Sequence, residues 1–311
     1  MNKLIVSSSP HIHTKDTTNR IMLDVIIALL PTTVAGAIIY GWRALLVVCA
    51  CVAASVVSEY LFNLVCKKEQ TISDLSAVVT GLLLALNLRA DAPIWQCVLG
   101  SVFAIVVVKC LFGGLGCNFA NPAITGRIFL MICFTSTIGG GAMTAASGLE
   151  TGATPLAIMK NMTTEGLPSL LDMFLGVRGG AIGEACILAL LIGFVYLAVR
   201  RVIHFETPLI FIGTVFVLSL IITNDPVLSL YHVMAGGLVL GAVFMATDYV
   251  TTPITRTGKM IFALGCGLIT VLIRFYGSYP EGVSFSILLM NILSPYIEKW
   301  TAPKALGGKK A

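Results

Sequence analysis

Acidic side chains within apolar stretches are the first residues that could do chemistry in this sequence. Asp24 and Glu184 each lie near the start of a long apolar run, and Glu59, Asp74 and Asp248 lie within or beside others. Because a charge inside a membrane span is costly and usually functional, Asp24 and Glu184 could form the entry points of a cation pathway. A carboxylate near a helix start is also stabilised by the helix dipole, so a purely structural cap explains both positions as well.

Two polar segments interrupt the apolar runs and predict non-helical backbone at helix ends. Residues 113–122 combine three glycines, two asparagines and a proline, and residues 247–256 combine threonines with one aspartate and one arginine. Irregular backbone is tolerated at membrane depth only against protein or a cavity. The second segment could form a hydrogen-bonding site for a polar ring or a phosphate, although a plain turn between helices has the same composition.

The elements that must position these residues are membrane helices. Of the 311 residues, 57% are hydrophobic and 11% are charged, whereas a soluble globular chain carries about 25% charged residues. So few charges cannot cover the outside of a soluble protein, but lipid accepts helices of about 20 apolar residues. The net charge of +5 fits basic loops beside a membrane and suggests no nucleic-acid partner.

The apolar runs predict an all-α membrane protein with about ten transmembrane helices. The expected helices cover residues 21–40, 44–65, 74–88, 94–112, 123–138, 182–199, 207–222, 230–247, 259–276 and 283–300.

The orientation follows from the placement of lysine and arginine, which favour cytoplasmic loops. With the N-terminus inside, Lys67, Lys68, Arg200 and Arg201 fall on inner loops, together with most other basic residues. Both termini are then cytoplasmic. The expected organisation is a cytoplasmic N-terminal segment (1–20), a first five-helix unit (21–138), an outer loop (139–181), a second five-helix unit (182–300) and a basic cytoplasmic tail (301–311).

The two five-helix units resemble each other when the sequence is shifted by 160 positions. Asp24 then falls on Glu184, and residues 80–93 align without a gap on residues 240–253, with glycine and proline in register. Because five is an odd number of crossings, the second unit must run through the bilayer upside down. Such inverted repeats are common in transport folds, with sites near their interface.

The nine cysteines predict no metal chemistry within this chain. They form no Cys-x-x-Cys pair and lie mostly in apolar runs, where a free cysteine packs as a small hydrophobe. The spacing needed for an iron–sulfur cluster held by this chain alone is missing. We expect no metal site and no catalytic residue in the chain itself.

The outer loop contains Thr-Gly-Ala-Thr-Pro-Leu at residues 151–156, which by composition is a flexible turn presenting hydroxyls. This segment resembles the flavinylation motif of the RnfD/NqrB family of membrane subunits of ion-pumping oxidoreductases. Further motifs similar to that family follow in order along the chain: Ser-Pro-His at 9–11, IALLPTT at 27–33, GLGCNFANPAITGR at 114–127, GGAIGE at 179–184 and ATDYVTTPITRTGK at 246–259. The length is more similar to RnfD than to NqrB.

The resemblance implies that Thr154 carries FMN through a phosphoester. Position 151 is threonine, where the family usually has serine or aspartate. In the family a separate flavin transferase attaches the group outside the cytoplasmic membrane. That side agrees with the outer position of the loop obtained from the basic residues, and an exposed flexible segment suits a hydroxyl that must reach another enzyme.

The resemblance also implies a non-covalent riboflavin in the helical bundle, a fold similar to that of urea transporters, and a place in a bacterial cytoplasmic membrane. The implied partners are the A, B, C, E and G subunits of an Rnf complex, some carrying iron–sulfur clusters or another covalent FMN. Candidate contacts to flavin or ion are Asn118, Asn121, Arg127, Asp248, Thr251 and Thr252.

The expected function is an electron relay coupled to Na⁺ or H⁺ movement, with flavins carrying the redox chemistry. The isolated chain is expected to catalyse nothing. Two alternatives belong to other classes. The first is a urea-transporter-like solute channel without flavin, and the second is a purely structural membrane protein. Covalently bound flavin distinguishes the channel from the relay, and complex activity after Thr154→Ala distinguishes the structural role.

Overall fold

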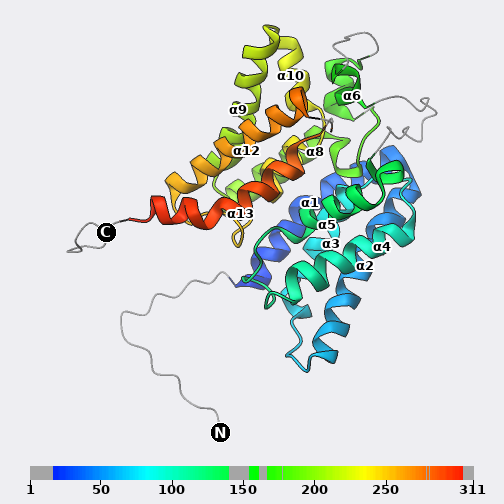
Figure 1. The fold of residues 1–311 in the computed structure, drawn as a ribbon. Helices are drawn as coiled ribbons and strands as arrows, with labels where there is room; N and C mark the ends of the chain where they lie inside the picture. The colour runs from blue at the N-terminus through cyan, green and yellow to red at the C-terminus, as the bar shows by residue number, and fades with distance from the viewer. Residues whose placement is uncertain are drawn as a thin grey trace.

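The structure, a computed structural model, describes residues 17–139, 154–160, 167–176, 178–277, 279 and 281–303. Throughout these residues the regular secondary structure is helical (Figure 1). This confirms the all-α prediction. The predicted N-terminal segment, most of the outer loop and most of the basic tail lie outside the described residues.

The first half of the chain forms helices close to the predicted ranges. They are α1 (Thr18–Tyr40), α2 (Trp42–Val65), η1 (Ile72–Asp74), α3 (Ser76–Leu86), α4 (Ile94–Val102), its π-helical continuation η2 (Phe103–Cys110), α5 (Pro122–Cys133) and η3 (Thr135–Gly139).

Two short helices, α6 (Pro155–Lys160) and α7 (Leu170–Leu175), precede the second half. It contains η4 (Ile182–Glu184), α8 (Ile187–Val199), α9 (Glu206–Thr223), α10 (Pro226–Met234), α11 (Leu238–Leu240), η5 (Gly241–Met245), α12 (Arg256–Tyr276) and α13 (Val283–Thr301).

The helices include several that could cross a membrane. Among the described residues, α1, α2, α9 and α12 are long and apolar enough, and α10 together with α11 and η5 makes a fifth candidate. Shorter apolar helices, such as α3 and α8, lie beside them. The chain is therefore a multi-pass membrane protein, whereas the predicted ten crossings remain a prediction.

The predicted helix over 230–247 is wrong in one respect, because the chain bends by 63° between Met234 and Leu238. Gly236 lies at the bend with φ of +70°, a conformation that favours glycine. The pattern of apolar residues runs through the break and so gave no sign of it.

Close packing between α1 and α8 joins the two halves of the chain. A Cβ at Gly193 would lie 2.3 Å from the carbonyl oxygen of Ala28. Buried residues of both halves, such as Leu29, Leu84, Leu240 and Phe262, belong to one continuous hydrophobic core. In Figure 1, α9, α12 and α13 group on one side of the molecule and α2 and α4 on the other.

Candidate functional site

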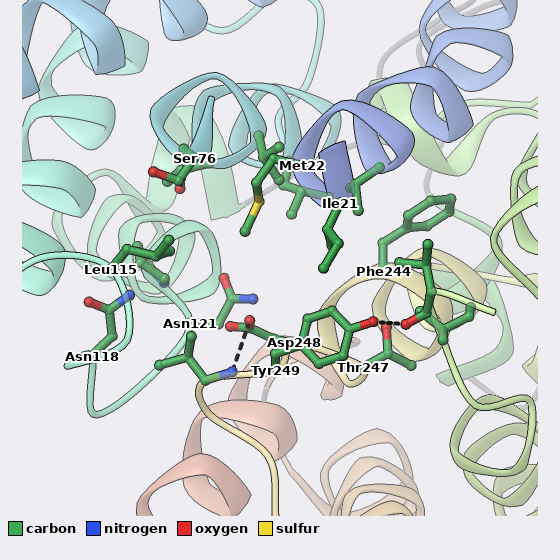
Figure 2. A pocket seen from close by; sticks show the side chains of 18 of the residues that line it. Ile21, Met22, Ser76, Leu115, Asn118, Asn121, Phe244, Thr247, Asp248 and Tyr249 are labelled. Carbon is green, nitrogen blue, oxygen red and sulfur yellow. Dashed lines mark hydrogen bonds between the residues drawn. The ribbon is translucent and has the colours of Figure 1, made fainter. Parts of the chain in front are cut away.

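A pocket, called here the inner pocket, lies where the two polar segments predicted from the sequence meet. Its polar lining includes Asn118 and Asn121 from the segment before α5, and Thr247 and Asp248 from the segment after η5 (Figure 2). Its apolar lining comes from α1, α3 and η5 and includes Ile21, Met22, Val25, Val79, Leu83 and Phe244.

The asparagines hold the entry into α5. Oδ1 of Asn121 accepts from the backbone N–H of Ala123 at 3.0 Å, which caps the helix, and Pro122 occupies the first helical position. Oδ1 of Asn118 is buried and has no hydrogen-bond partner in the described residues. A buried polar atom without a partner is rare in native proteins, and Asn118 is also one of the residues that line the pocket.

Asp248 organises the segment after η5. Its Oδ2 accepts from Oγ1 of Thr251 at 3.1 Å, and Oγ1 of Thr252 donates to the Asp248 carbonyl at 2.5 Å. Thr251 and Thr252 are buried and do not line the inner pocket. In the structure, Thr251 and Thr252 therefore stabilise the turn around Asp248 and do not face the inner pocket.

Lys109 also lines the inner pocket and was not among the residues predicted from the sequence. Its side chain is 2% exposed and pairs with Glu59, with 2.7 Å between Nζ and Oε2. A lone lysine inside an apolar run, with an acid inside a neighbouring run, is a signal that could have identified the pair.

A second and larger space, called here the outer cavity, contains Thr154 in its wall. The cavity has a volume of about 400 Å³ and is bordered by Asn87, Arg89, Arg127, Thr154, Arg178, Glu184 and Glu281, among others. Oγ1 of Thr154 accepts from the backbone N–H of Ala157 at 3.2 Å, where α6 begins. Thr154 is half-buried at this position.

A buried charge cluster forms one side of the outer cavity. The Arg127 guanidinium is paired with Glu281 through a short hydrogen bond and lies 3.6 Å from Glu184. Its Nη1 also donates to Oδ1 of Asn87 at 2.7 Å. The Glu281 carboxylate accepts from the backbone N–H of Gly237 at 2.9 Å, at the bend before α11.

Arg178 approaches the same cluster from the segment before η4. Its Nη2 donates to the Glu184 carbonyl at 2.6 Å, and the residue is 4% exposed. The positive charges of Arg127 and Arg178 are balanced by the negative charges of Glu184 and Glu281. A third arginine, Arg274, donates to the neutral backbone carbonyls of His232 and Ala235, so its positive charge is not balanced by these bonds. The balance of buried charge suits an anionic group in the cavity.

The structure thus brings together only part of the predicted site. Thr154, Arg127 and Glu184 meet at the outer cavity, whereas Asn118, Asn121 and Asp248 meet at the inner pocket. Asp24 lines neither space. It is 6% exposed and accepts from the Tyr196 hydroxyl at 2.9 Å and from Nη2 of Arg200 at 3.0 Å.

The two spaces lie at opposite ends of a pair of short helices. Ser76, at the start of α3, and Phe244, near the end of η5, both line the inner pocket. Asn87, just after α3, and Gly236, just before α11, both line the outer cavity. α3 and α11–η5 therefore run in opposite directions between the two spaces.

Known proteins similar to this chain are named as subunits of ion-translocating oxidoreductase complexes. The model of the NQR2, RnfD, RnfE family matches residues 5–307. The chain is 48% identical to the D subunit of the Na⁺-translocating ferredoxin:NAD⁺ oxidoreductase complex of Acetobacterium woodii, over 99% of this chain and 96% of that protein. It is 43% identical to the D subunit of the proton-translocating ferredoxin:NAD⁺ oxidoreductase complex of Clostridium ljungdahlii, over 99% and 98%.

A third relative, the D subunit of the ion-translocating oxidoreductase complex of Stutzerimonas stutzeri, is 39% identical over 94% of this chain and 93% of that protein. These matches cover nearly the whole sequence and confirm the resemblance carried by the motifs. The chain belongs to the NQR2, RnfD, RnfE family.

Proposed function

We propose that this chain is the D-type membrane component of an ion-translocating ferredoxin:NAD⁺ oxidoreductase complex, and that it relays electrons through bound flavin while Na⁺ or H⁺ moves across the membrane. Its relatives carry that name and match over nearly their full length, which supports the proposal. Activity belongs to the assembled complex, so the isolated chain catalyses nothing. One relative is named for Na⁺ and another for protons at similar identity, so identity alone does not select the ion.

The observation that carries the proposal is the position of Thr154 on the wall of the outer cavity. A hydroxyl there, beside a cavity of about 400 Å³ bordered by Arg127 and Arg178, suits an FMN joined to Oγ1 through a phosphodiester. The arginine charges would stabilise the phosphodiester anion and any negative charge on the ring. Bound FMN supplies the one- and two-electron chemistry that amino-acid side chains lack.

The inner pocket is the proposed place of the non-covalent flavin, riboflavin. The lining suits a ring with polar and apolar parts. Asn118, Asn121 and Asp248 supply polar groups, and Oδ1 of Asn118 has no partner among the described residues, while Met22 and Phe244 supply apolar walls. The pocket is partly open and has a volume of about 90 Å³, so a flavin would enter it with one edge of its ring.

The proposed architecture is a pair of inverted five-helix repeats with ten membrane crossings, similar to urea transporters. The shift of 160 positions supports it, because α3 (Ser76–Leu86) falls on 236–246, where α11 and η5 lie, and α5 (Pro122–Cys133) falls on the start of α13. The opposite directions of α3 and α11–η5 agree with an upside-down second unit.

The proposed setting is a bacterial cytoplasmic membrane with both termini inside and Thr154 outside. Lipid and the A, B, C, E and G subunits of the complex are the proposed surroundings. A flavin transferase acting from outside would attach the FMN to Thr154.

Covalent flavin is tested directly on a denaturing gel. The chain is produced together with its flavin transferase, and the band is examined for yellow-green fluorescence. We expect fluorescence in the native chain and in Thr151→Ala, and none in Thr154→Ala, because the ester oxygen belongs to Thr154. A band without fluorescence, or one that keeps it after Thr154→Ala, contradicts the assignment and favours a channel without flavin.

A further inference from the structure

A continuous chain of hydrogen bonds leads from the surface between α2 and α3 to the inner pocket. Oγ1 of Thr71, an exposed residue, donates to Oε1 of Glu59 at 2.6 Å. The other carboxylate oxygen of Glu59 accepts from Nζ of Lys109 at 2.7 Å. Lys109 lines the inner pocket, so three side chains connect the surface to it.

A second branch joins Lys109 to the same surface. Nζ of Lys109 donates to Oγ of Ser76 at 2.6 Å, and Oγ of Ser76 donates to Oδ1 of Asp74 at 2.5 Å. Asp74 is half-buried and belongs to η1, three residues after Thr71. Both branches therefore begin in the segment between α2 and α3 and converge on Lys109.

The backbone around Lys109 is unusual in a way that often accompanies function. Lys109 lies in the π-helical part of α4, η2 (Phe103–Cys110). π-Helical turns are rare and occur frequently at functional sites. Glu59 is 1% exposed and Lys109 is 2% exposed, so both charges are removed from water except through this chain of groups.

A purely structural ion pair is the alternative. Replacing a buried ion pair by apolar residues of similar volume is often neutral or stabilising, so stability alone does not explain this pair. A structural pair also needs no link to the surface at one end and to a pocket at the other. The pair here has both, and Asp248 lies in the lining of the same pocket as a further acid.

We propose that Thr71, Glu59 and Lys109, with Ser76 and Asp74 as a second branch, form a proton-uptake path to the ligand of the inner pocket. The inference rests on the proposed function, in which that ligand is a flavin reduced by two electrons that arrive one at a time from reduced iron–sulfur carriers of the partner subunits. Nζ of Lys109 gives one proton to the reduced ring. The Thr71 hydroxyl relays a proton from the aqueous phase to Glu59, Glu59 passes it to Nζ of Lys109, and the original charges are restored.

The test separates proton transfer from charge. Lys109→Arg keeps the positive charge beside Glu59, but arginine does not release a proton in proteins. The double variant Glu59→Gln/Lys109→Met removes both charges and keeps the pair neutral, so that no buried charge is left alone. The matched control is Glu206→Gln/Arg256→Met, which removes an ion pair whose arginine is 79% exposed and whose residues do not line the inner pocket.

The variants are made in the complete complex carrying Thr154→Ala and produced without its flavin transferase, so that neither the covalent flavin of this chain nor that of a partner subunit contributes. The flavin is reduced by flash photoreduction, and proton uptake is followed with a pH-indicator dye in weak buffer. We expect Lys109→Arg and the Glu59/Lys109 double variant to slow proton uptake at least tenfold, and the Glu206/Arg256 control to keep the wild-type rate.

Flavin released by denaturation is measured in every sample. If flavin is present and either Lys109 variant takes up protons at the wild-type rate, the path is wrong while the proposed function stands. If the complex releases no non-covalent flavin from this chain, the proposal of a flavin in the inner pocket is wrong. The proton-uptake path is then wrong too, because it has no acceptor.

Discussion

The guanidinium of Arg127 lies at the edge of the outer cavity among two carboxylates and one side-chain amide oxygen. It is 7% exposed and contacts Glu281, Glu184 and Asn87. Arg127→Met would leave two buried carboxylates without their main partner, and breaking such a pair costs about 3–5 kcal/mol. We expect a large fall in the unfolding temperature of the purified chain in detergent.

The matched control for this residue is Arg256→Met. The Arg256 side chain is 79% exposed and pairs with Glu206 at the surface, where an ion pair contributes about 0–1 kcal/mol. Its unfolding temperature should stay near that of the native chain. Equal losses in the two variants would contradict the view that the Arg127 cluster holds the outer cavity together.

Individual residues were predictable where local sequence decides their place. The Asn-Pro pair at Asn121 indicated a helix entry, and the structure has α5 begin there. Arg127 belongs to the same motif but lies six residues further along a helix, about 9 Å away, and so reaches a different space. Glu281 and Arg178 were missed because their roles depend on how the folded chain places them around Arg127 and Glu184.

At the scale of elements, the contact between α1 and α8 depends on the absence of a side chain at Gly193. Its Cβ would lie 2.3 Å from the backbone oxygen of Ala28, so Gly193→Ala must push the two helices apart. We expect destabilisation of about 1–3 kcal/mol, the usual cost of overpacking, seen as a lower unfolding temperature.

Gly213, in the middle of α9, is the control for that substitution. A Cβ there meets nothing within 4 Å. Since alanine favours a helix over glycine by about 1 kcal/mol, Gly213→Ala should be neutral or stabilising. A loss in Gly213→Ala as large as that in Gly193→Ala would mean that close helix approach is not the cause.

The elements themselves were largely predictable, because apolar runs and helix starts are local. The bend between α10 and α11 was not. The sequence there stays apolar from Val227 to Met245 except for a few residues, and the N–H that the bend exposes at Gly237 is satisfied by Glu281, 44 residues away. Only the folded chain brings that carboxylate to the bend.

At the scale of the whole molecule, the orientation in the membrane can be tested with reporter fusions. The proposed topology puts the segment containing Ser169 outside and the segment containing Arg201 inside. Alkaline phosphatase, which is active only outside the cytoplasm, should be active when fused after residue 169 and inactive when fused after residue 201. Green fluorescent protein at the C-terminus should fluoresce, and the reverse pattern would contradict the topology.

α3 and η5 each extend between the inner pocket and the outer cavity, and the part of the chain between these two spaces is called here the wall. Leu84, Ala85 and Leu86 are fully buried in it, and the stretch of helix from Ser76 to Asn87 spans about 16 Å. An electron can tunnel through such apolar packing, but a hydrated ion cannot enter it. With a redox group on each side, the wall would conduct electrons while insulating against ions, so the translocated cation would have to take a different route.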